Sequence, residues 1–354
     1  MQIALDLAKK GMHTAKPNPR VGCIVVSENK IVGQGWHRQT GEAHAEAIAL
    51  SEAGDKAKDS TVYSTLEPCT HHGQTPPCVE ALIAAAVGKV VYAMEDPNPV
   101  VSGQSRKILE SAEIEVISGV LSQESKDLNI GFNKRMKYGL PYIRTKIAAS
   151  IDGKTALLNG KSQWISSKQS RDDVQLWRAR SCALVTSIDT VIADDPSLNV
   201  RINDFSDIDQ PTRVILDSQL RIRGDYKILK SPGDVIVYSL QQVHNDPIFE
   251  GMIENTNERD GHVSLESVFR DLAKKEINEV MFECGGTLNG ALLKQNFIDE
   301  IIIYLAPCIL GDQANNMFSL PAISAMSERY NFNLIQVDRT GDDIRVILRK
   351  ANPV

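Results

Sequence analysis

One histidine and two cysteines in the first eighty residues constrain this chain most tightly. Glu46 stands two residues after His44, and Cys69 and Cys78 each follow a proline further along. One imidazole and two thiolates are a favourable ligand set for zinc, and they leave the fourth position open for water. A fold that uses them must bring three separate segments of the chain to one point.

An open fourth position predicts a catalytic zinc site, because a structural site closes all four positions with protein ligands. Zinc-bound water loses a proton near neutral pH and becomes a nucleophile. Glu46 is the candidate catalytic residue, since a carboxylate beside the water can carry protons to a leaving nitrogen. H-x-E followed by P-C is typical of zinc deaminases, although the spacing between the two cysteines is longer here.

Other interpretations of these residues stay open at this stage. His71 or His72 would make the zinc site structural by supplying a fourth ligand. His37 follows a predicted strand and either reaches the site or belongs to a plain loop. Asn18 and Asn98 are candidate substrate ligands that orient a ring by hydrogen bonds, or they shape turns beside their prolines.

Length and charge narrow the class of protein. The 354 residues predict about two domains, and the net charge of −6 argues against a general nucleic-acid binder. The apolar run 301–310 contains Pro307 and is too short to span a bilayer, so a buried strand is expected there. Residues 1–10 lack the layout of a signal peptide, so we expect a cytoplasmic protein with no membrane partner. Scattered cysteines argue against a disulfide framework.

Alternating helices and strands predict an α/β protein throughout. In the first part, we expect helices at 3–10, 44–53, 78–86 and 103–112, and strands at 21–26, 30–35, 61–66, 89–94 and 115–118. A basic patch followed by Gly139 and Pro141 marks a boundary near residues 132–141. Beyond it we expect strands at 142–150, 183–192, 212–217, 234–239, 279–284, 300–306 and 343–349. A helix at 168–180 is expected to begin with Ser166 and Gln169 in capping-box spacing.

Longer motifs resemble those of a known family. Residues 65–69 read TLEPC and residues 72–78 read HGQTPPC, and the second half carries KIAASIDGK at 146–154, SQWIS at 162–166, TVIADDPSL at 190–198 and ECGGTLNG at 283–290. Together with H-A-E at 44–46, these resemble the bifunctional riboflavin-biosynthesis family. Its members fuse a diaminohydroxyphosphoribosylaminopyrimidine deaminase to a 5-amino-6-(phosphoribosylamino)uracil reductase.

The resemblance implies a cytidine-deaminase-like zinc domain over residues 1–140 and a dihydrofolate-reductase-like domain over 141–354. It implies Zn²⁺ and NADPH as cofactors, a pyrimidine ribosyl phosphate as substrate, and a homo-oligomer, either dimer or tetramer. The long spacing between the cysteines is this family's form of the motif. Gln74 departs from it, because that position is commonly basic in the family and Gln74 carries no charge.

The resemblance also implies the sites. The residues expected to contact NADPH are Ala148, Trp164, Thr190, Asp194, Ser218, Gly285, Gly286, Thr287, Leu288, Asn289, Gly290 and Ala291. The residues expected to contact substrate in the second domain are Ser162, Arg178, Leu198, Arg201 and Glu283. The junction at Gly285 would offer free N–H groups at a helix start, which suits a phosphate. Lys146 with Asp194 would act near the reacting carbon, and Trp164 flanks the cofactor or lies in the core.

Two other functions share the zinc motif. A deaminase acting on tRNA would need a basic channel lined by aromatic side chains, which this acidic composition does not favour. A non-catalytic zinc scaffold would not need Glu46. The leading hypothesis is therefore the bifunctional enzyme, with hydrolytic deamination of the pyrimidine followed by reduction of its ribosyl group to ribityl.

Overall fold

A computed structural model describes residues 1–70, 76–98, 102–202, 208–241 and 247–351. The chain divides into two compact units, Met1–Leu140 and Pro141–Val354. No helix among the described residues is both long enough and apolar enough to cross a membrane.

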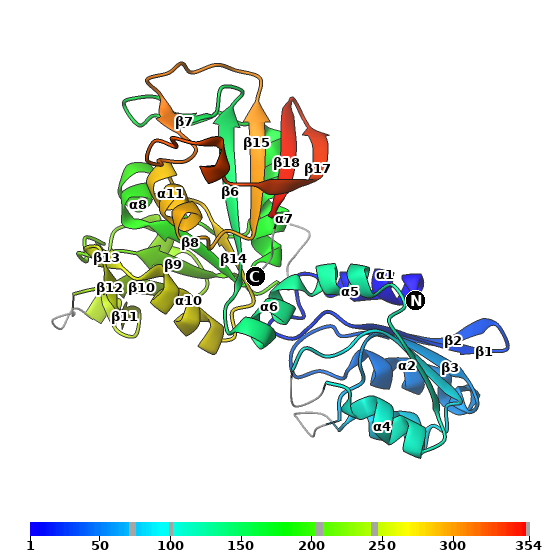
Figure 1. Ribbon diagram of the computed structural model, residues 1–354. Helices are drawn as coiled ribbons and strands as arrows, with labels where there is room; N and C mark the ends of the chain where they lie inside the picture. The colour runs from blue at the N-terminus through cyan, green and yellow to red at the C-terminus, as the bar shows by residue number, and fades with distance from the viewer. Residues whose placement is uncertain (71–75, 99–101, 203–207, 242–246, 352–354) are drawn as a thin grey trace. The chain divides into compact units, whose positions relative to one another are not determined.

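The first unit is a five-stranded sheet with helices on both faces (Figure 1). In chain order it contains α1 (Gln2–Lys10), β1 (Gly22–Ser27), β2 (Lys30–Trp36), α2 (Ala45–Ala53), a 3₁₀ turn (Gly54–Ala57), β3 (Thr61–Leu66), α3 (Cys78–Ala84), β4 (Lys89–Met94), α4 (Gln104–Ser111), β5 (Glu115–Ser118), α5 (Ser122–Leu128) and α6 (Ile130–Tyr138). The strand order is β2-β1-β3-β4-β5. Strands β3, β4 and β5 run parallel, so β3 and β4 end at the same edge.

Two glycines on β2 determine how closely α2 packs. A Cβ at Gly33 would lie 2.0 Å from the carbonyl oxygen of Ala49, and one at Gly35 would lie 2.5 Å from that of Ala45. Only glycine permits this approach without a shift of the backbone. The alanine-rich face of α2 therefore rests directly on the sheet, which brings the start of α2 against the sheet.

The second unit contains a nine-stranded sheet ordered β11-β10-β9-β8-β14-β6-β15-β18-β17. Its elements are β6 (Tyr142–Ser150), β7 (Lys154–Ala156), α7 (Lys168–Arg180), β8 (Ala183–Ser187), α8 (Ile188–Asp194), β9 (Thr212–Leu216), α9 (Lys227–Lys230), β10 (Val235–Ser239), a 3₁₀ turn (Pro247–Phe249), β11 (Ile253–Asn255), β12 (Glu258–Arg259), β13 (His262–Val263), α10 (Leu265–Lys274), β14 (Glu279–Phe282), α11 (Gly286–Lys294), β15 (Glu300–Ala306), β16 (Asn315–Asn316), a 3₁₀ turn (Met326–Glu328), β17 (Phe332–Thr340) and β18 (Asp343–Lys350). The strands from β11 to β15 are parallel, and β18 and β17 complete one edge in antiparallel fashion.

Two expectations need correction. The strand expected at 183–192 ends at Ser187, whose side chain accepts a hydrogen bond from the Thr190 N–H and starts α8. The N-cap of α7 is Ser167 rather than Ser166, and its side chain accepts from the Ser170 N–H. The chain divides between Leu140 and Pro141, inside the predicted boundary region; α6 reaches Tyr138 within that region, and Gly139 ends it in a left-handed conformation at φ 64°.

Candidate active sites

The three predicted zinc ligands meet at one point in the first unit. His44 is the residue before α2, Cys69 follows β3, and Cys78 is the first residue of α3. Their ligand atoms all lie within 4.8 Å of one another. His44 Nδ1 is 3.2 Å from Cys78 Sγ and 3.5 Å from Cys69 Sγ. One nitrogen and two sulfurs at this separation are the donor set that zinc prefers, so these residues fit the metal.

The surroundings favour a thiolate at Cys69. The Cys78 N–H donates to Cys69 Sγ at 3.2 Å. Hydrogen bonds from Cys78 lower the pKa of Cys69 to about 4, with a further contribution from His44. The hydrogen bond between the Cys78 thiol and Cys69, together with burial, raises the pKa of Cys78. A positively charged ion would displace that proton, because metal binding requires deprotonated thiols.

Glu46 lies against this cluster in the first turn of α2. Its side chain is buried at 3% exposure, and burial raises its pKa. Ser64 Oγ, on β3, donates to Oε1 at 2.9 Å, while Oε2 lies 3.5 Å from Cys78 Sγ. A buried carboxylate beside the ligand atoms, with its pKa raised by burial, is suited to taking up and releasing protons.

Asn18 and His37 form a polar pair next to the cluster. Asn18 Nδ2 lies 3.0 Å from His37 Nε2, and the His37 ring meets the His44 ring edge-on at a centroid distance of 5.6 Å. Burial lowers the pKa of His37, which favours a neutral ring. His37, which sequence alone left between a loop role and a site role, therefore orients Asn18 beside the cluster.

Asn98 lies in the bend that follows β4. It is half-buried, and its N–H donates to Asp96 Oδ1 at 2.8 Å. Because β3 and β4 are parallel neighbours, this bend and the segment with Cys69 leave the same edge of the sheet. His71, His72 and Gln74, which bear on the four-ligand alternative and on the family departure, lie outside the described residues.

A charged cluster centres on Glu283 in the second unit, just beyond β14. Arg178 donates to both carboxylate oxygens, from Nε to Oε1 at 2.6 Å and from Nη2 to Oε2 at 3.1 Å. Lys146 Nζ, on the neighbouring β6, lies 3.0 Å from Oε2. Burial opposes ionisation of Glu283, but Arg178 and Lys146 outweigh it and hold its pKa well below the usual range. The cluster thus presents fixed positive charge at the carboxyl end of β14.

Several residues expected to contact NADPH gather at that same edge. Thr190, Ser218 and Gly285 follow β8, β9 and β14, which are consecutive in the sheet. Ligands of open α/β sheets bind outside the carboxyl ends of the strands. Ser218 Oγ accepts from the Val263 N–H at 3.0 Å, which fixes the turn after β9. Asp194 ends α8 and is exposed, and Ala148 is half-buried on β6.

The residues of the glycine-rich junction have different environments. Gly285 caps α11, and a Cβ there would meet nothing within 4 Å. A Cβ at Gly286 would lie 2.3 Å from the Asn316 carbonyl oxygen, and one at Gly290 would lie 2.1 Å from that of Ser319. Asn289 is fully buried and accepts from Thr145 Oγ1 at 2.6 Å. Gly285 thus has open space at its Cβ position. Gly286, Asn289 and Gly290 instead contact the backbone of the 316–319 segment. Thr287 is exposed, and Leu288 and Ala291 are half-buried.

The remaining candidates are more dispersed. Trp164 is 71% exposed, with the Arg171 guanidinium 4.5 Å from its ring centroid, so it is not a core residue. Ser162 is half-buried on the same loop. Leu198 is 3% exposed and belongs to the apolar core, so its side chain has little surface to offer a substrate. Arg201 donates from Nη1 to Asn199 Oδ1 at 2.7 Å, and Arg178 donates to the Asn199 carbonyl oxygen at 3.0 Å.

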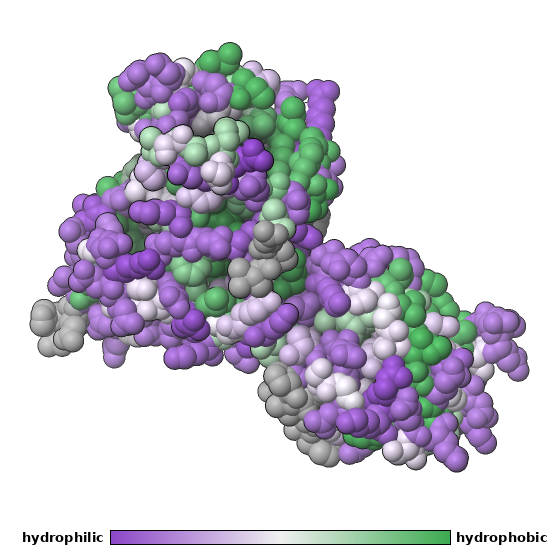
Figure 2. Space-filling view, viewed as in Figure 1, coloured by the Kyte–Doolittle hydropathy of each residue, from purple (hydrophilic) through white to green (hydrophobic). Residues whose placement is uncertain are grey.

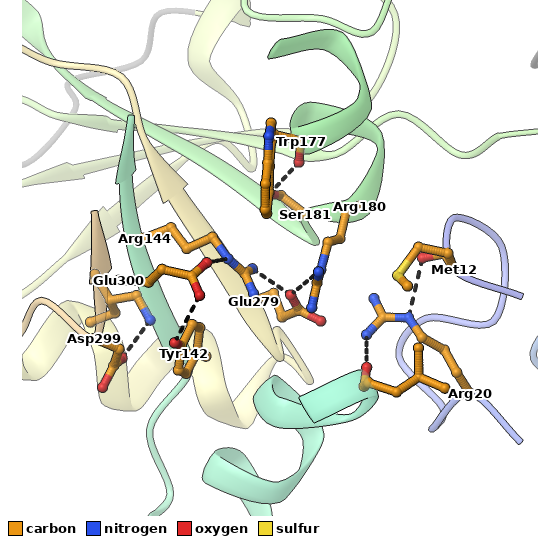
Figure 3. Close-up of polar contacts among 12 residues, drawn as sticks. Met12, Arg20, Tyr142, Arg144, Trp177, Arg180, Ser181, Glu279, Asp299 and Glu300 are labelled. Atoms are coloured by element: carbon orange, nitrogen blue, oxygen red, sulfur yellow. Dashed lines mark hydrogen bonds and ion pairs between the residues drawn. The ribbon is translucent and has the colours of Figure 1, made fainter. Parts of the chain in front are cut away.

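A buried ionic network at the amino ends of β14 and β15 was not predicted from sequence (Figure 3). Arg144 is 1% exposed and pairs with both Glu279 and Glu300. Arg180 reaches Glu279 at 3.0 Å, and Arg349 reaches Glu300 at 2.8 Å. The network lies at the opposite ends of the strands from Gly285 and Glu283, so it belongs to the scaffold.

Comparison with known proteins accounts for both units. Residues 1–94 match the family model of the cytidine and deoxycytidylate deaminase zinc-binding region, and residues 141–346 match the RibD C-terminal domain. The chain is 43% identical to riboflavin biosynthesis protein RibD of Escherichia coli (strain K12), covering 97% of this chain and 96% of that protein. The structure of Acinetobacter baumannii RibD (form 1) is 42% identical with a TM-score of 0.93, covering 99% of this chain and 98% of that one. A diaminohydroxyphosphoribosylaminopyrimidine deaminase/5-amino-6-(5-phosphoribosylamino)uracil reductase from Thermotoga maritima is 31% identical with a TM-score of 0.89, covering 99% and 97%.

Proposed function

This chain belongs to the RibD family of bifunctional riboflavin-biosynthesis enzymes, and from that premise we propose which residues carry out each of the two reactions. Residues 1–140 form the deaminase domain and residues 141–354 the reductase domain. The substrate is a diaminopyrimidine that carries a ribosyl phosphate. Family membership favours this assignment over a nucleic-acid deaminase or a zinc scaffold.

His44, Cys69 and Cys78 hold the zinc ion of the deaminase. Bound zinc supplies Lewis-acid activation of water near neutral pH. Glu46 takes a proton at Oε2, the oxygen that faces the ligand cluster, and passes it to the leaving amino nitrogen. Ser64 holds the other carboxylate oxygen in place. Asn18, fixed by His37, and Asn98 bind the ring through their side-chain amides.

NADPH binds along the carboxyl ends of β9, β8 and β14, with Gly285 leaving room for the cofactor at the start of α11. Bound NADPH supplies the hydride that converts the ribosyl group to ribityl. Lys146 and Asp194 lie near the reacting carbon. Glu283 orients Lys146 and Arg178, and Arg178 together with Arg201 binds the anionic substrate. Ser162 and Trp164 line the periphery of this site.

The observation that supports this function most strongly is the cluster of His44, Cys69 and Cys78 beside the buried carboxylate of Glu46. The decisive test is incubation with the diaminopyrimidine ribosyl phosphate, with and without NADPH, followed by mass measurement. Without NADPH, the product should have lost its amino group as ammonia. With NADPH, the product should carry two further hydrogens. NADPH oxidation on the undeaminated substrate, or absence of ammonia release, would contradict the assignment.

We also propose that the enzyme forms a homo-oligomer through β17. This edge strand exposes Leu334 at 63%, Ile335 at 46% and Val337 at 53%, and Figure 2 shows hydrophobic surface along this side of the second unit. A long apolar edge strand is a template for pairing with another chain. Sedimentation should therefore show at least a dimer, and Val337→Lys should shift it toward monomer; a monomeric parent protein would exclude this interface.

The cytoplasm is the proposed location. All six cysteines are free thiols, and two of them are candidate zinc ligands that must stay reduced. A reducing compartment keeps such thiols available. Fractionation of cells that express the full chain should recover both activities in the cytoplasmic fraction.

A further inference from the structure

A buried carboxylate next to the zinc-ligand cluster ties together two segments of the first unit. Glu67 is 2% exposed. Its Oε2 accepts from the N–H of Asp96 at 3.1 Å and from that of Gly103 at 3.0 Å. Its Oε1 accepts from the N–H of Ser105 at 3.2 Å and from Ser105 Oγ at 2.7 Å. One side chain thus satisfies four donors, and all four are neutral.

The position of Glu67 in the sheet gives these bonds a functional consequence. Glu67 directly follows β3, and its N–H donates to the Met94 carbonyl oxygen at the end of β4 at 2.9 Å. Asp96 precedes Asn98 and Gly103 follows it in the chain, so the carboxylate binds the backbone on both sides of Asn98. The Ser102 N–H, next to Gly103, donates to the Asn98 carbonyl oxygen at 3.0 Å. The anchor for Asn98 therefore stands two residues before the zinc ligand Cys69.

A carboxylate is required chemically at this position. Burying a charge is costly unless several donors compensate it. Here each oxygen accepts two hydrogen bonds, so both must be acceptors. A glutamine has a single carbonyl oxygen, and its NH₂ group would point at two donors in place of an acceptor. The isosteric amide would therefore lose either the two bonds to Asp96 and Gly103 or the two bonds to Ser105, while leaving the volume of the side chain unchanged.

We propose that Glu67 is a positioning residue for deamination, which acts by binding the backbone at Asp96 and Gly103, on either side of Asn98 in the chain, so that Asn98 meets the substrate ring. The inference rests on the proposed substrate role of Asn98. Glu67 itself does not touch the substrate. It sets the place of a binding group, so its loss weakens substrate binding more than it slows the chemical step.

The experiment compares full-length, zinc-loaded Glu67→Gln with the parent enzyme and with Glu95→Gln, an exposed carboxylate at the same end of β4. Glu67→Gln should raise the deaminase KM about tenfold while kcat changes by less than about threefold. Zinc content and the reductase rate on deaminated substrate should stay at parent values. Glu95→Gln should match the parent. Loss of zinc, or a fall in kcat at unchanged KM, would overturn the inference, because either would place the effect on the metal centre.

A double-mutant cycle with Asn98→Ala tests the route of action. If Glu67 acts through Asn98, the double variant should have the KM of Asn98→Ala alone. If the two substitutions raised KM independently, so that their effects multiplied in the double variant, the proposed route through Asn98 would be wrong. An Asn98→Ala enzyme with the parent KM would also overturn it. A parent enzyme that releases no ammonia would instead contradict the proposed function. If Glu67→Gln does not fold, Ser105→Ala removes only the hydroxyl donor and should raise KM by about threefold; parent KM in that variant would also overturn the proposal.

Discussion

Ser64 and Glu46 make a buried hydrogen bond from the central strand to the first turn of α2. Ser64 Oγ lies 2.9 Å from Glu46 Oε1, and the serine is fully buried. The bond leaves Oε2 facing Cys78 Sγ at 3.5 Å. The two carboxylate oxygens are therefore distinct: the sheet fixes one, and the other faces the metal ligands.

Replacing Glu46 by glutamine should nearly abolish deamination. The amide preserves the shape but cannot carry a proton between water and the leaving nitrogen. Loss of a general acid–base group lowers rates by about 10²- to 10⁴-fold. Ammonia release measured at saturating substrate, with zinc content and the reductase rate as controls, checks this. A normal rate of ammonia release would exclude Glu46 as the proton carrier.

Ser64→Ala should weaken deamination more mildly. The substitution removes the donor to Oε1 and frees the carboxylate to rotate. A hydrogen bond to a charged group contributes about 1.5–3 kcal/mol, so we expect kcat to fall about tenfold or more. Ser51→Ala, on the exposed side of α2, is the matched control. Equal kcat values for the two variants would show that the bond does not position Glu46.

Sequence alone predicted most of the first unit because the information is local. The predicted helices and strands follow the apolar periodicity, the α/β class is confirmed, and the zinc-type residues meet as their spacing predicts. Ser64 was missed because a serine inside an apolar strand carries no motif. Its partner is 18 residues away in the chain, on a helix whose packing against the sheet depends on glycines of β2.

The second unit was harder to predict because similar residues serve different purposes there. The apolar run at 183–192 continues past the end of β8, and only the Ser187 cap shows where α8 begins. The glycines of the 285–290 junction are alike in sequence, yet only the structure separates the open one from those that touch the 316–319 backbone. The pairing of Arg144 with Glu279 and Glu300 depends on strand order, which composition does not reveal.

Glu283→Gln should destabilise the second unit in a pH-dependent way. The pKa of Glu283 is lowered in the folded protein from a reference of 4.5, because Arg178 and Lys146 outweigh burial. A carboxyl with a depressed folded pKa adds stability above its unfolded pKa, and that stability is lost as pH falls through the folded value. At neutral pH, the free energy of unfolding of the variant should thus be about 3 kcal/mol lower than that of the parent, a gap between the two proteins that depends on pH. In urea titrations this gap should be constant from about pH 6 to 8 and shrink below about pH 4.5; a gap that widens in acid would contradict the ion-pair account.

Gly285→Ala and Gly286→Ala should separate cofactor binding from folding. Gly285 has φ −76° and open space at its Cβ position, so alanine fits the fold but narrows the room for a phosphate at the start of α11. We expect the KM for NADPH to rise by about tenfold or more, with an unchanged melting temperature. At Gly286 the added Cβ would lie 2.3 Å from the Asn316 carbonyl oxygen, so the backbone must shift and the melting temperature should fall. Binding of NADP⁺ by calorimetry and thermal unfolding of both variants measure the two effects directly. If Gly285→Ala bound NADP⁺ as the parent does, the cofactor would not approach this helix start.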